Sequence, residues 1–160
     1  MPVSHIEKLK KGTPPERLEA INMLAELGSR EAVEPLCEAL GASNWAIRSS
    51  AAYALGAIGE AAAVPFLVSA LRDGNDKVRK SAAKALGMLK AREAAGPLIA
   101  LLDDGSSDVR RSAARSLGQI GESLACGPLK EHMMDDVSYV KSYIIKAIKE
   151  VCPPEEWPDI

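Results

Sequence analysis

The feature that most constrains this chain is a repeat of 31 residues that runs without a gap. The rows begin at Glu16, Ile47, Val78, Val109 and Val140. Their clearest segment reads IRSSAAYALGAIG, VRKSAAKALGMLK and VRRSAARSLGQIG in the three middle rows, while the first row is a weaker copy and the last is shorter. A fixed period of this length is typical of solenoids, in which each unit stacks only on its neighbours.

Each row contains two helical segments. In the first segment the apolar residues fall at steps 0, 4, 8 and 11, which is one stripe of an α-helix. Alanine at steps 4 and 5 lets neighbouring helices approach closely, as expected of a chain with only 4% aromatic residues. The first segment ends at a glycine, the residue that favours helix C-caps, in three rows and at a lysine in one: Gly28, Gly59, Lys90 and Gly121. A proline lies near the start of each second segment: Pro35, Pro65, Pro97 and Pro128.

These patterns predict one all-α domain over residues 1–160, a right-handed superhelix of about ten helices. The predicted units are a half repeat at 4–15, repeats at 16–46, 47–77, 78–108 and 109–139, a terminal helix at 140–151 and a tail at 152–160. Ser4 and Glu7 have capping-box spacing at the start of the first helix. The tail is expected to be a loose or capping segment.

The pattern V-R-x-x-A-A-x-A-L-G-x-I-G, followed by A-V-P-x-L, resembles the HEAT-like repeat of the phycobilisome-lyase type over roughly residues 4 to 151. That class includes bilin lyase subunits, an iron-dependent hydroxylase, relatives of DNA glycosylases and many adaptor proteins. The resemblance implies that the first helix of each row lines the concave side of the solenoid, where such proteins usually bind partners.

Residues for catalysis or metal binding are sparse. The hydroxylase relatives ligate iron through paired His-Glu motifs, whereas this chain has only His5 and His132, so we expect no metal, no cofactor and no catalytic residue. Cys37, Cys126 and Cys152 show no CxxC spacing and are odd in number, which favours reduced thiols in a cytoplasmic protein.

No membrane span is expected either. The stretch from Ala51 to Leu71 carries one charge, Glu60, but the repeat places a turn at its middle. The net charge is −2, so no whole-molecule field attracts nucleic acid or acidic lipid.

One face of each first helix is left free by the repeat. Steps 2, 3, 6 and 10 fall in one arc opposite the buried stripe. The residues predicted to bind a partner lie on this face or flank it: Trp45, Tyr53, Lys80, Lys84, Arg111, Arg115, Tyr143 and Lys146. The alternative is a solvated surface in which Asp76 or Asp108 pairs with the cations. The step-1 cations recur with the motif itself, so we expect them to pack against the aspartates of the preceding turn: Arg48, Arg79, Arg110 and Lys141.

Three function classes follow. The favoured one is a monomeric, non-catalytic adaptor that binds an acidic protein segment on its concave face. The second is a subunit that holds a substrate protein for an enzyme system such as chromophore attachment. A nucleic-acid binder is third, because binding a phosphate backbone requires more positive charge than a chain of net charge −2 offers.

Overall fold

The computed structural model describes residues 2–157, and this part of the chain contains ten α-helices and no strand. The even-numbered helices are long: α2 (Pro14–Glu26), α4 (Trp45–Ile58), α6 (Asp76–Met88), α8 (Ser107–Ile120) and α10 (Ser138–Val151). The odd-numbered helices are shorter: α1 (Pro2–Lys11), α3 (Val33–Ala39), α5 (Val64–Ala70), α7 (Ala95–Ala100) and α9 (Cys126–Glu131). No helix among the described residues is long and apolar enough to cross a membrane.

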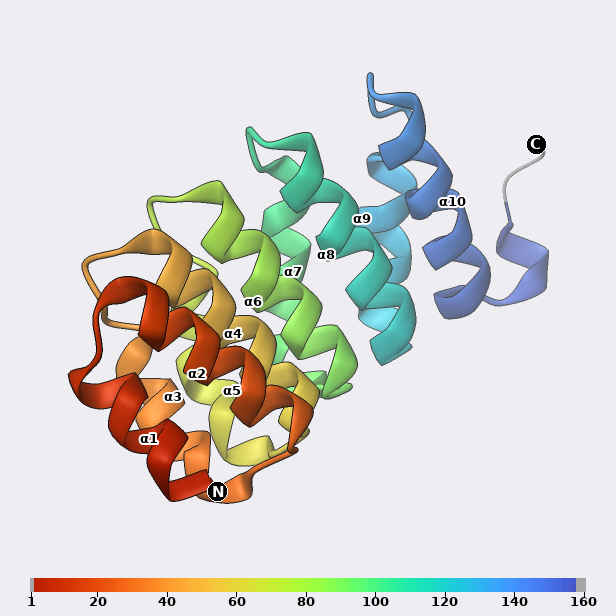
Figure 1. Cartoon of the computed structure of the whole chain (residues 1–160). Helices are drawn as coiled ribbons and strands as arrows, with labels where there is room; N and C mark the ends of the chain where they lie inside the picture. The colour runs from red at the N-terminus through yellow and green to blue at the C-terminus, as the bar shows by residue number, and fades with distance from the viewer. Residues whose placement is uncertain (1, 158–160) are drawn as a thin grey trace.

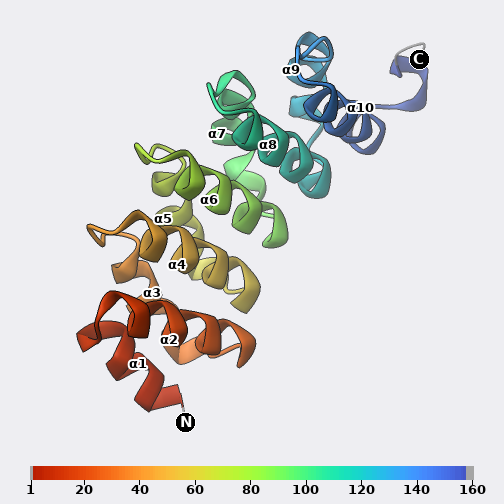
Figure 2. The same ribbon diagram turned by 45° about the horizontal axis from the view of Figure 1, so that its top comes forward.

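The helices form two stacked layers, one of even-numbered and one of odd-numbered helices (Figure 1). The stack bends so that the even-numbered helices lie on its inner side (Figure 2), and we call the two layers the inner and outer helices. The predicted right-handed solenoid of helical hairpins is confirmed.

A 3₁₀ turn follows each inner helix, and after the first four inner helices it leads into the next outer helix. These turns recur at the repeat spacing of 31 residues: η1 (Arg30–Ala32), η2 (Ala61–Ala63), η3 (Arg92–Ala94), η5 (Ser123–Ala125) and η6 (Pro154–Glu156). One further turn, η4 (Leu101–Asp103), extends α7. Since η6 keeps the register, the tail begins as a regular continuation of the fifth row. It is tied to α9 by an ion pair of 2.6 Å between Lys130 Nζ and Glu156 Oε2.

Small residues allow the inner helices to touch. The alanines at steps 4 and 5 of the middle rows are fully buried: Ala51, Ala52, Ala82, Ala83, Ala113 and Ala114. A Cβ atom added to Gly56 would lie 2.6 Å from Ala85 Cα, and one added to Gly87 would lie 2.5 Å from Ser116 Oγ. Glycine at step 9 is therefore required by contact between backbones rather than by a turn.

The C-terminal turns of the inner helices use left-handed backbone. Gly28, Gly59 and Gly121 have φ values of 58°, 84° and 74°, as expected of C-cap glycines. Lys90 takes the same place in the third row with φ of 50°. The left-handed conformation costs a residue with a Cβ atom roughly 1–2 kcal/mol. The turn of the third row is therefore less stable than it would be with glycine.

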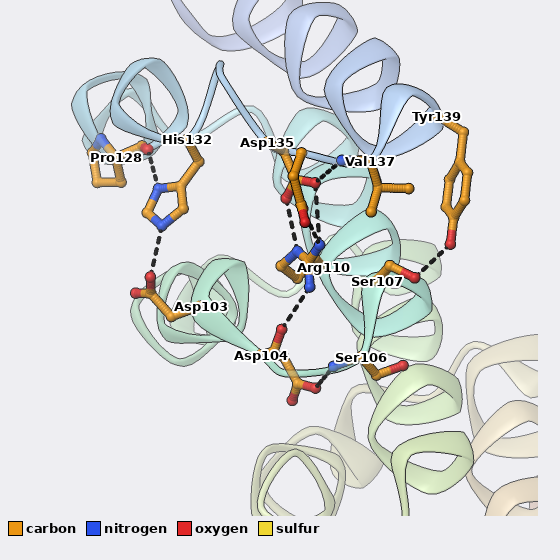
Figure 3. A network of polar contacts seen from close by, with 11 residues as sticks. Asp103, Asp104, Ser106, Ser107, Arg110, Pro128, His132, Asp135, Val137 and Tyr139 are labelled. Atoms are coloured by element: carbon orange, nitrogen blue, oxygen red, sulfur yellow. Dashed lines mark hydrogen bonds and ion pairs between the residues drawn. The ribbon is translucent and has the colours of Figure 1, made fainter.

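The arginine at step 1 joins each row to the next. Arg110 Nε donates to Asp135 Oδ2 at 2.7 Å and its Nη1 donates to the main-chain carbonyl of Asp104 at 3.0 Å (Figure 3). The Asp135 carboxylate also accepts the Val137 N–H at 2.9 Å, which fixes the turn before α10. The same arrangement links two further pairs, Arg48 to Asp73 and Arg79 to Asp104. We call these three pairs the arginine ladder.

The expected structural role of these arginines is confirmed, but the predicted carboxylate was the wrong one. Each guanidinium pairs with the aspartate 25 residues later, which lies in the turn before the next inner helix, and takes only main-chain carbonyls from the turn before its own helix. The hydrogen bond from Arg110 is the main reason why the pKa of Asp135 lies below its ordinary value. The ladder is therefore charged throughout the neutral range.

The first row lacks this link. Arg17 occupies step 1, and the position 25 residues later is Ala42 instead of aspartate. The Nε of Arg17 is buried, and it has no hydrogen-bond partner among the described residues. The weak match of the first row thus has a structural counterpart in an incomplete ladder.

Two predictions made from the sequence are wrong. Helix α1 begins at Pro2, so Ser4 lies inside it, and the capping box belongs to α2 instead, where Glu16 Oε2 accepts the Thr13 N–H at 2.8 Å. Cys126 and Cys152 are not free thiols but form a disulfide, and both are buried; Cys37 alone is free. The cytoplasmic location, which was inferred from unpaired thiols, loses that support.

Candidate partner-binding face

The residues predicted to bind a partner all lie on the inner helices. Trp45 and Tyr53 come from α4, Lys80 and Lys84 from α6, Arg111 and Arg115 from α8, and Tyr143 and Lys146 from α10. We call the solvent-facing side of these helices the inner face. Trp45, Tyr53, Arg115 and Lys146 are exposed, while the other four side chains are partly buried.

Two of the five cations are paired with one carboxylate of the same face. Lys80 Nζ lies 2.7 Å from Asp108 Oδ2, and Arg111 Nη2 lies 3.2 Å from Asp108 Oδ1. The hydrogen bond from Lys80 is the main cause of the lowered pKa of Asp108. One carboxylate therefore holds two cations, which agrees with the pairing that the solvated-surface alternative assigned to Asp108.

Several of the cations lie against the faces of aromatic rings. Lys84 Nζ lies 5.1 Å from the centre of the Tyr53 ring, and Arg111 Cζ lies 5.4 Å and 6.0 Å from the rings of Tyr139 and Tyr143. Lys77 Nζ lies 4.7 Å above Trp45 at the start of α4. Contacts at this distance attract a cation to the ring face and limit its movement. The aromatic and basic residues of the face are thus positioned against one another before any partner binds.

A groove of about 500 Å³ lies between α6, α8 and α10. Its lining combines cations, small residues and a few larger side chains: Gly87, Met88, Lys90, Arg115, Gly118, Gln119, Tyr143, Lys146, Ala147 and Glu150. We call it the C-terminal groove. Within residues 2–157, neither Arg115 nor Lys146 has a carboxylate within ion-pair distance. These two exposed cations remain available to an anion.

A second groove of about 480 Å³ lies between α2, α4 and α6. It contains hydroxyl and amide groups, the Tyr53 ring and one carboxylate, Glu26. Ser49 and Ser81 share a hydrogen bond of 2.9 Å between their hydroxyls at this site. Positive charge is therefore concentrated in the C-terminal half of the inner face and does not run along its whole length.

Sequence reasoning missed part of the C-terminal groove. Met88, Gln119 and Glu150 occupy step 10 in successive rows, a step assigned to the free face but not compared between rows. Step 3 was assigned to the same face, yet Ser112 is only 4% exposed and donates to the Asp108 carbonyl at 2.9 Å. Ser112 therefore does not belong to the free face, whereas Tyr143 at the same step lines the C-terminal groove.

The His132 side chain contacts Asp103 of η4 and the main chain of α9, the helix that ends just before it. Its Nε2 lies 2.9 Å from Asp103 Oδ1 and its Nδ1 lies 2.7 Å from the Pro128 carbonyl (Figure 3). Both ring nitrogens are therefore engaged in contacts that tie α9 to η4. The described residues contain no group of three or more His, Cys, Asp or Glu side chains that could hold a metal ion.

Comparison with known proteins identifies the repeat. The family described as HEAT repeats matches residues 5–83 and 64–149, which together cover most of the chain. The chain belongs to the HEAT repeat family. No curated protein matches this HEAT repeat chain.

Solved structures agree with this assignment. The HEAT repeats are similar to a chain in the complex of CpcE and CpcF of phycocyanin lyase from Nostoc sp. PCC7120, with 27% identity and a TM-score of 0.87 over 98% of this chain and 67% of that one. A designed armadillo repeat protein in complex with the peptide (KR)4 is 20% identical, with a TM-score of 0.72 over 91% of this chain and 80% of that one. Human deoxyhypusine hydroxylase is 20% identical, with a TM-score of 0.63 over 91% of this chain and 72% of that one. The last two similarities show the fold alone.

Proposed function

We propose that this HEAT repeat protein is a non-catalytic scaffold that binds an acidic segment of a partner protein on its inner face. The supporting observation is the C-terminal groove, where exposed Arg115 and Lys146 face solvent without a carboxylate partner among residues 2–157. In a chain of net charge −2, two such cations on a concave surface favour an anionic ligand.

Preformed aromatic contacts strengthen the proposal. Tyr53 and Tyr143 lie beside Lys84 and Arg111, so these side chains lose little conformational freedom when a partner arrives. Tyrosine, tryptophan and arginine are also the residues that most often contribute most of the binding energy at protein interfaces. The inner face therefore offers both anchors and charge.

The test is charge reversal on the inner face. The double variant Lys84→Glu/Arg115→Glu should bind the native partner at least tenfold more weakly and with a flatter salt dependence, since two attractive charges become repulsive. Its far-UV circular dichroism should match wild type because neither side chain belongs to the core. The matched control is Lys8→Glu/Lys11→Glu on the outer helix α1, where both side chains are exposed. Equal affinity of wild type and the inner-face variant would contradict the proposal.

A second function is favoured by one observation, the similarity to the CpcE and CpcF complex over nearly the whole chain. Under this alternative the chain is an accessory subunit that holds a substrate protein while chromophore is attached elsewhere. It predicts that covalent chromophore absorbance on phycocyanin appears in a reconstituted mixture only when this chain is present. Binding of an acidic segment without any such dependence favours the scaffold. A nucleic-acid binder comes third, for the reason of charge given above.

A further inference from the structure

Lys90 stands where the repeat uses glycine. It is the only non-glycine residue with positive φ among the described residues, and the equivalent positions in the other rows hold Gly28, Gly59 and Gly121. A lysine there costs conformational energy that glycine does not, while the turn it forms is the same. Since the turn gains nothing from this side chain, a contact outside the turn is the better explanation for it.

The Lys90 side chain is exposed and belongs to the C-terminal groove. It joins Arg115 of α8 and Lys146 of α10, so three cations from three successive rows line one hollow. Glu150 is the only acidic residue in the lining, which leaves an excess of two positive charges in the groove. This imbalance requires an anion from outside the described residues if the groove is to be neutralised.

Two glycines of neighbouring inner helices line the C-terminal groove. Gly87 and Gly118 lie where α6, α8 and α10 touch, and a Cβ atom on Gly118 would lie 3.2 Å from Ala147 Cα. The absence of a side chain at these positions lets the helices pack closely, and the groove that the two glycines help to line has a volume of about 500 Å³. That volume accommodates the carboxylate side chain of a peptide and part of its backbone.

We infer that Lys90, Arg115 and Lys146 form an anchoring subsite for an aspartate or glutamate side chain of the acidic partner segment. The inference rests on the proposed function, because it names the point at which the inner face holds its partner. A peptide is preferred to nucleic acid because three cations and Glu150 that line a single groove match a carboxylate side chain rather than an extended phosphate backbone. Lys90 contributes to binding, although it makes its own turn less stable than glycine would.

The test measures binding and stability in the same variants, with fluorescein-labelled octaglutamate as the probe. By fluorescence anisotropy, Lys90→Gly should bind about two- to fivefold more weakly, the range expected for one exposed charge pair. Its Tm should be unchanged or higher by up to about 4 °C, because glycine suits the left-handed turn. Lys90→Arg keeps the charge and should retain the affinity. The matched control Lys11→Gln removes one exposed lysine from outer helix α1 and should bind like wild type.

The results that would contradict the subsite differ from those that would contradict the proposed function. Wild-type affinity in Lys90→Gly, with weakened binding in Lys84→Glu/Arg115→Glu, would overturn the subsite and leave the scaffold proposal standing. A lower Tm in Lys90→Gly would also overturn the inference, since the lysine would then serve the turn. Tighter binding of a single-stranded oligonucleotide than of octaglutamate at equal salt would replace the peptide with nucleic acid. Wild-type affinity in every variant would sink both proposals.

Discussion

Each arginine of the ladder connects the turn before its own inner helix with the turn before the next inner helix. Arg79, for example, donates to the Asp73 carbonyl at 2.8 Å and to the Asp104 carboxylate at 2.8 Å and 2.9 Å. The Asp104 carboxylate in turn accepts the Ser106 N–H at 2.8 Å. Bidentate pairs of this kind are strong when they are partly removed from water, and loss of one partner leaves a charge without compensation. A gap in the ladder should therefore be measurable.

Filling the gap in the first row should stabilise the chain. In Ala42→Asp, the new carboxylate lies at the position where it can pair with Arg17, whose Nε has no partner within the described part of the chain. We expect a gain of about 1 kcal/mol, or about 2–4 °C in Tm. Ala42→Asn has nearly the same shape without the charge and should gain less. A lower Tm in Ala42→Asp than in wild type would show that Arg17 does not belong to the ladder.

His132 should make one contact sensitive to pH. Burial lowers the pKa of His132, but the hydrogen bonds to Asp103 and to the Pro128 carbonyl raise the pKa by a larger amount. The net shift of the pKa is therefore upward. A folded-state pKa above the unfolded value means that the contribution to stability is complete below about pH 6.5 and is lost as pH rises through the folded-state pKa. Thermal unfolding should show a larger deficit in His132→Gln relative to wild type at about pH 5.5 than at about pH 8.5.

A direct titration supplies the control for this prediction. By NMR, the His132 pKa should fall in Asp103→Asn, which removes the charged acceptor but keeps the shape. Because the Asp103 side chain is 80% exposed, solvent screens the interaction and the effect on stability should be small. An unchanged His132 pKa in Asp103→Asn would contradict the assignment of the upward shift to this contact.

At the scale of elements, the C-terminal end of the stack is fastened by several contacts. The Cys126–Cys152 disulfide joins the start of α9 to the residue after α10, and Lys130 of α9 pairs with Glu156 of η6. Trp157 Nε1 donates to the Cys152 carbonyl at 3.1 Å, and Lys149 Nζ lies 5.9 Å from the centre of its ring. These contacts tie α9, α10 and η6 to one another.

Removing the disulfide should loosen this end alone. The loop that it closes spans 26 residues, for which loop-closure entropy predicts a loss of about 2–4 kcal/mol in Cys126→Ser/Cys152→Ser. Hydrogen exchange should speed up in α9, α10 and η6 but not in α4 or α6. A thiol reductant should reproduce the effect in wild type and in Cys37→Ser, whose substituted cysteine is free. Unchanged exchange in α10 after reduction would contradict this account of the C-terminal end.

The opposite end should fray first. The first row is the weaker copy of the repeat, and Arg17 has no ladder partner among the described residues. Native-state hydrogen exchange should therefore be faster in α1 and α2 than in α6 and α8. Uniform protection from Glu16 to Val151 would contradict this order.

At the scale of the whole molecule, what could be predicted depends on whether a contact lies inside one row. The turn glycines such as Gly59 were predictable, because a C-cap needs only its own helix. The inner face was predictable from helical periodicity, and Tyr53, Arg115 and Lys146 do face solvent there. The fold class followed from the 31-residue period together with the helical spacing of apolar residues inside each row.

Contacts between rows could not be predicted from the sequence in the same way. Cys126 and Cys152 are 26 residues apart, and Lys80 and Asp108 are 28 apart, so each pair meets only through the offset between stacked helices. The 31-residue period defines where each row begins, but it does not define the offset between stacked helices. That offset depends on how closely glycine and alanine allow the helices to pack. The disulfide therefore could not be predicted from the repeat pattern, and the pairing of Lys80 with Asp108 could be named only as an alternative.

The central claim is that a protein partner occupies the inner face, and site-specific photo-crosslinking tests it most directly. A benzophenone side chain is placed either at Gln119 of α8, in the C-terminal groove, or at Phe66 of outer helix α5, and both positions are exposed. After irradiation in native lysate, Gln119 should yield one dominant cross-linked protein whose recovery falls in the Lys84→Glu/Arg115→Glu background, and Phe66 should yield none. The same protein captured from Phe66 and not from Gln119 would place the partner on the outer helices and contradict the claim.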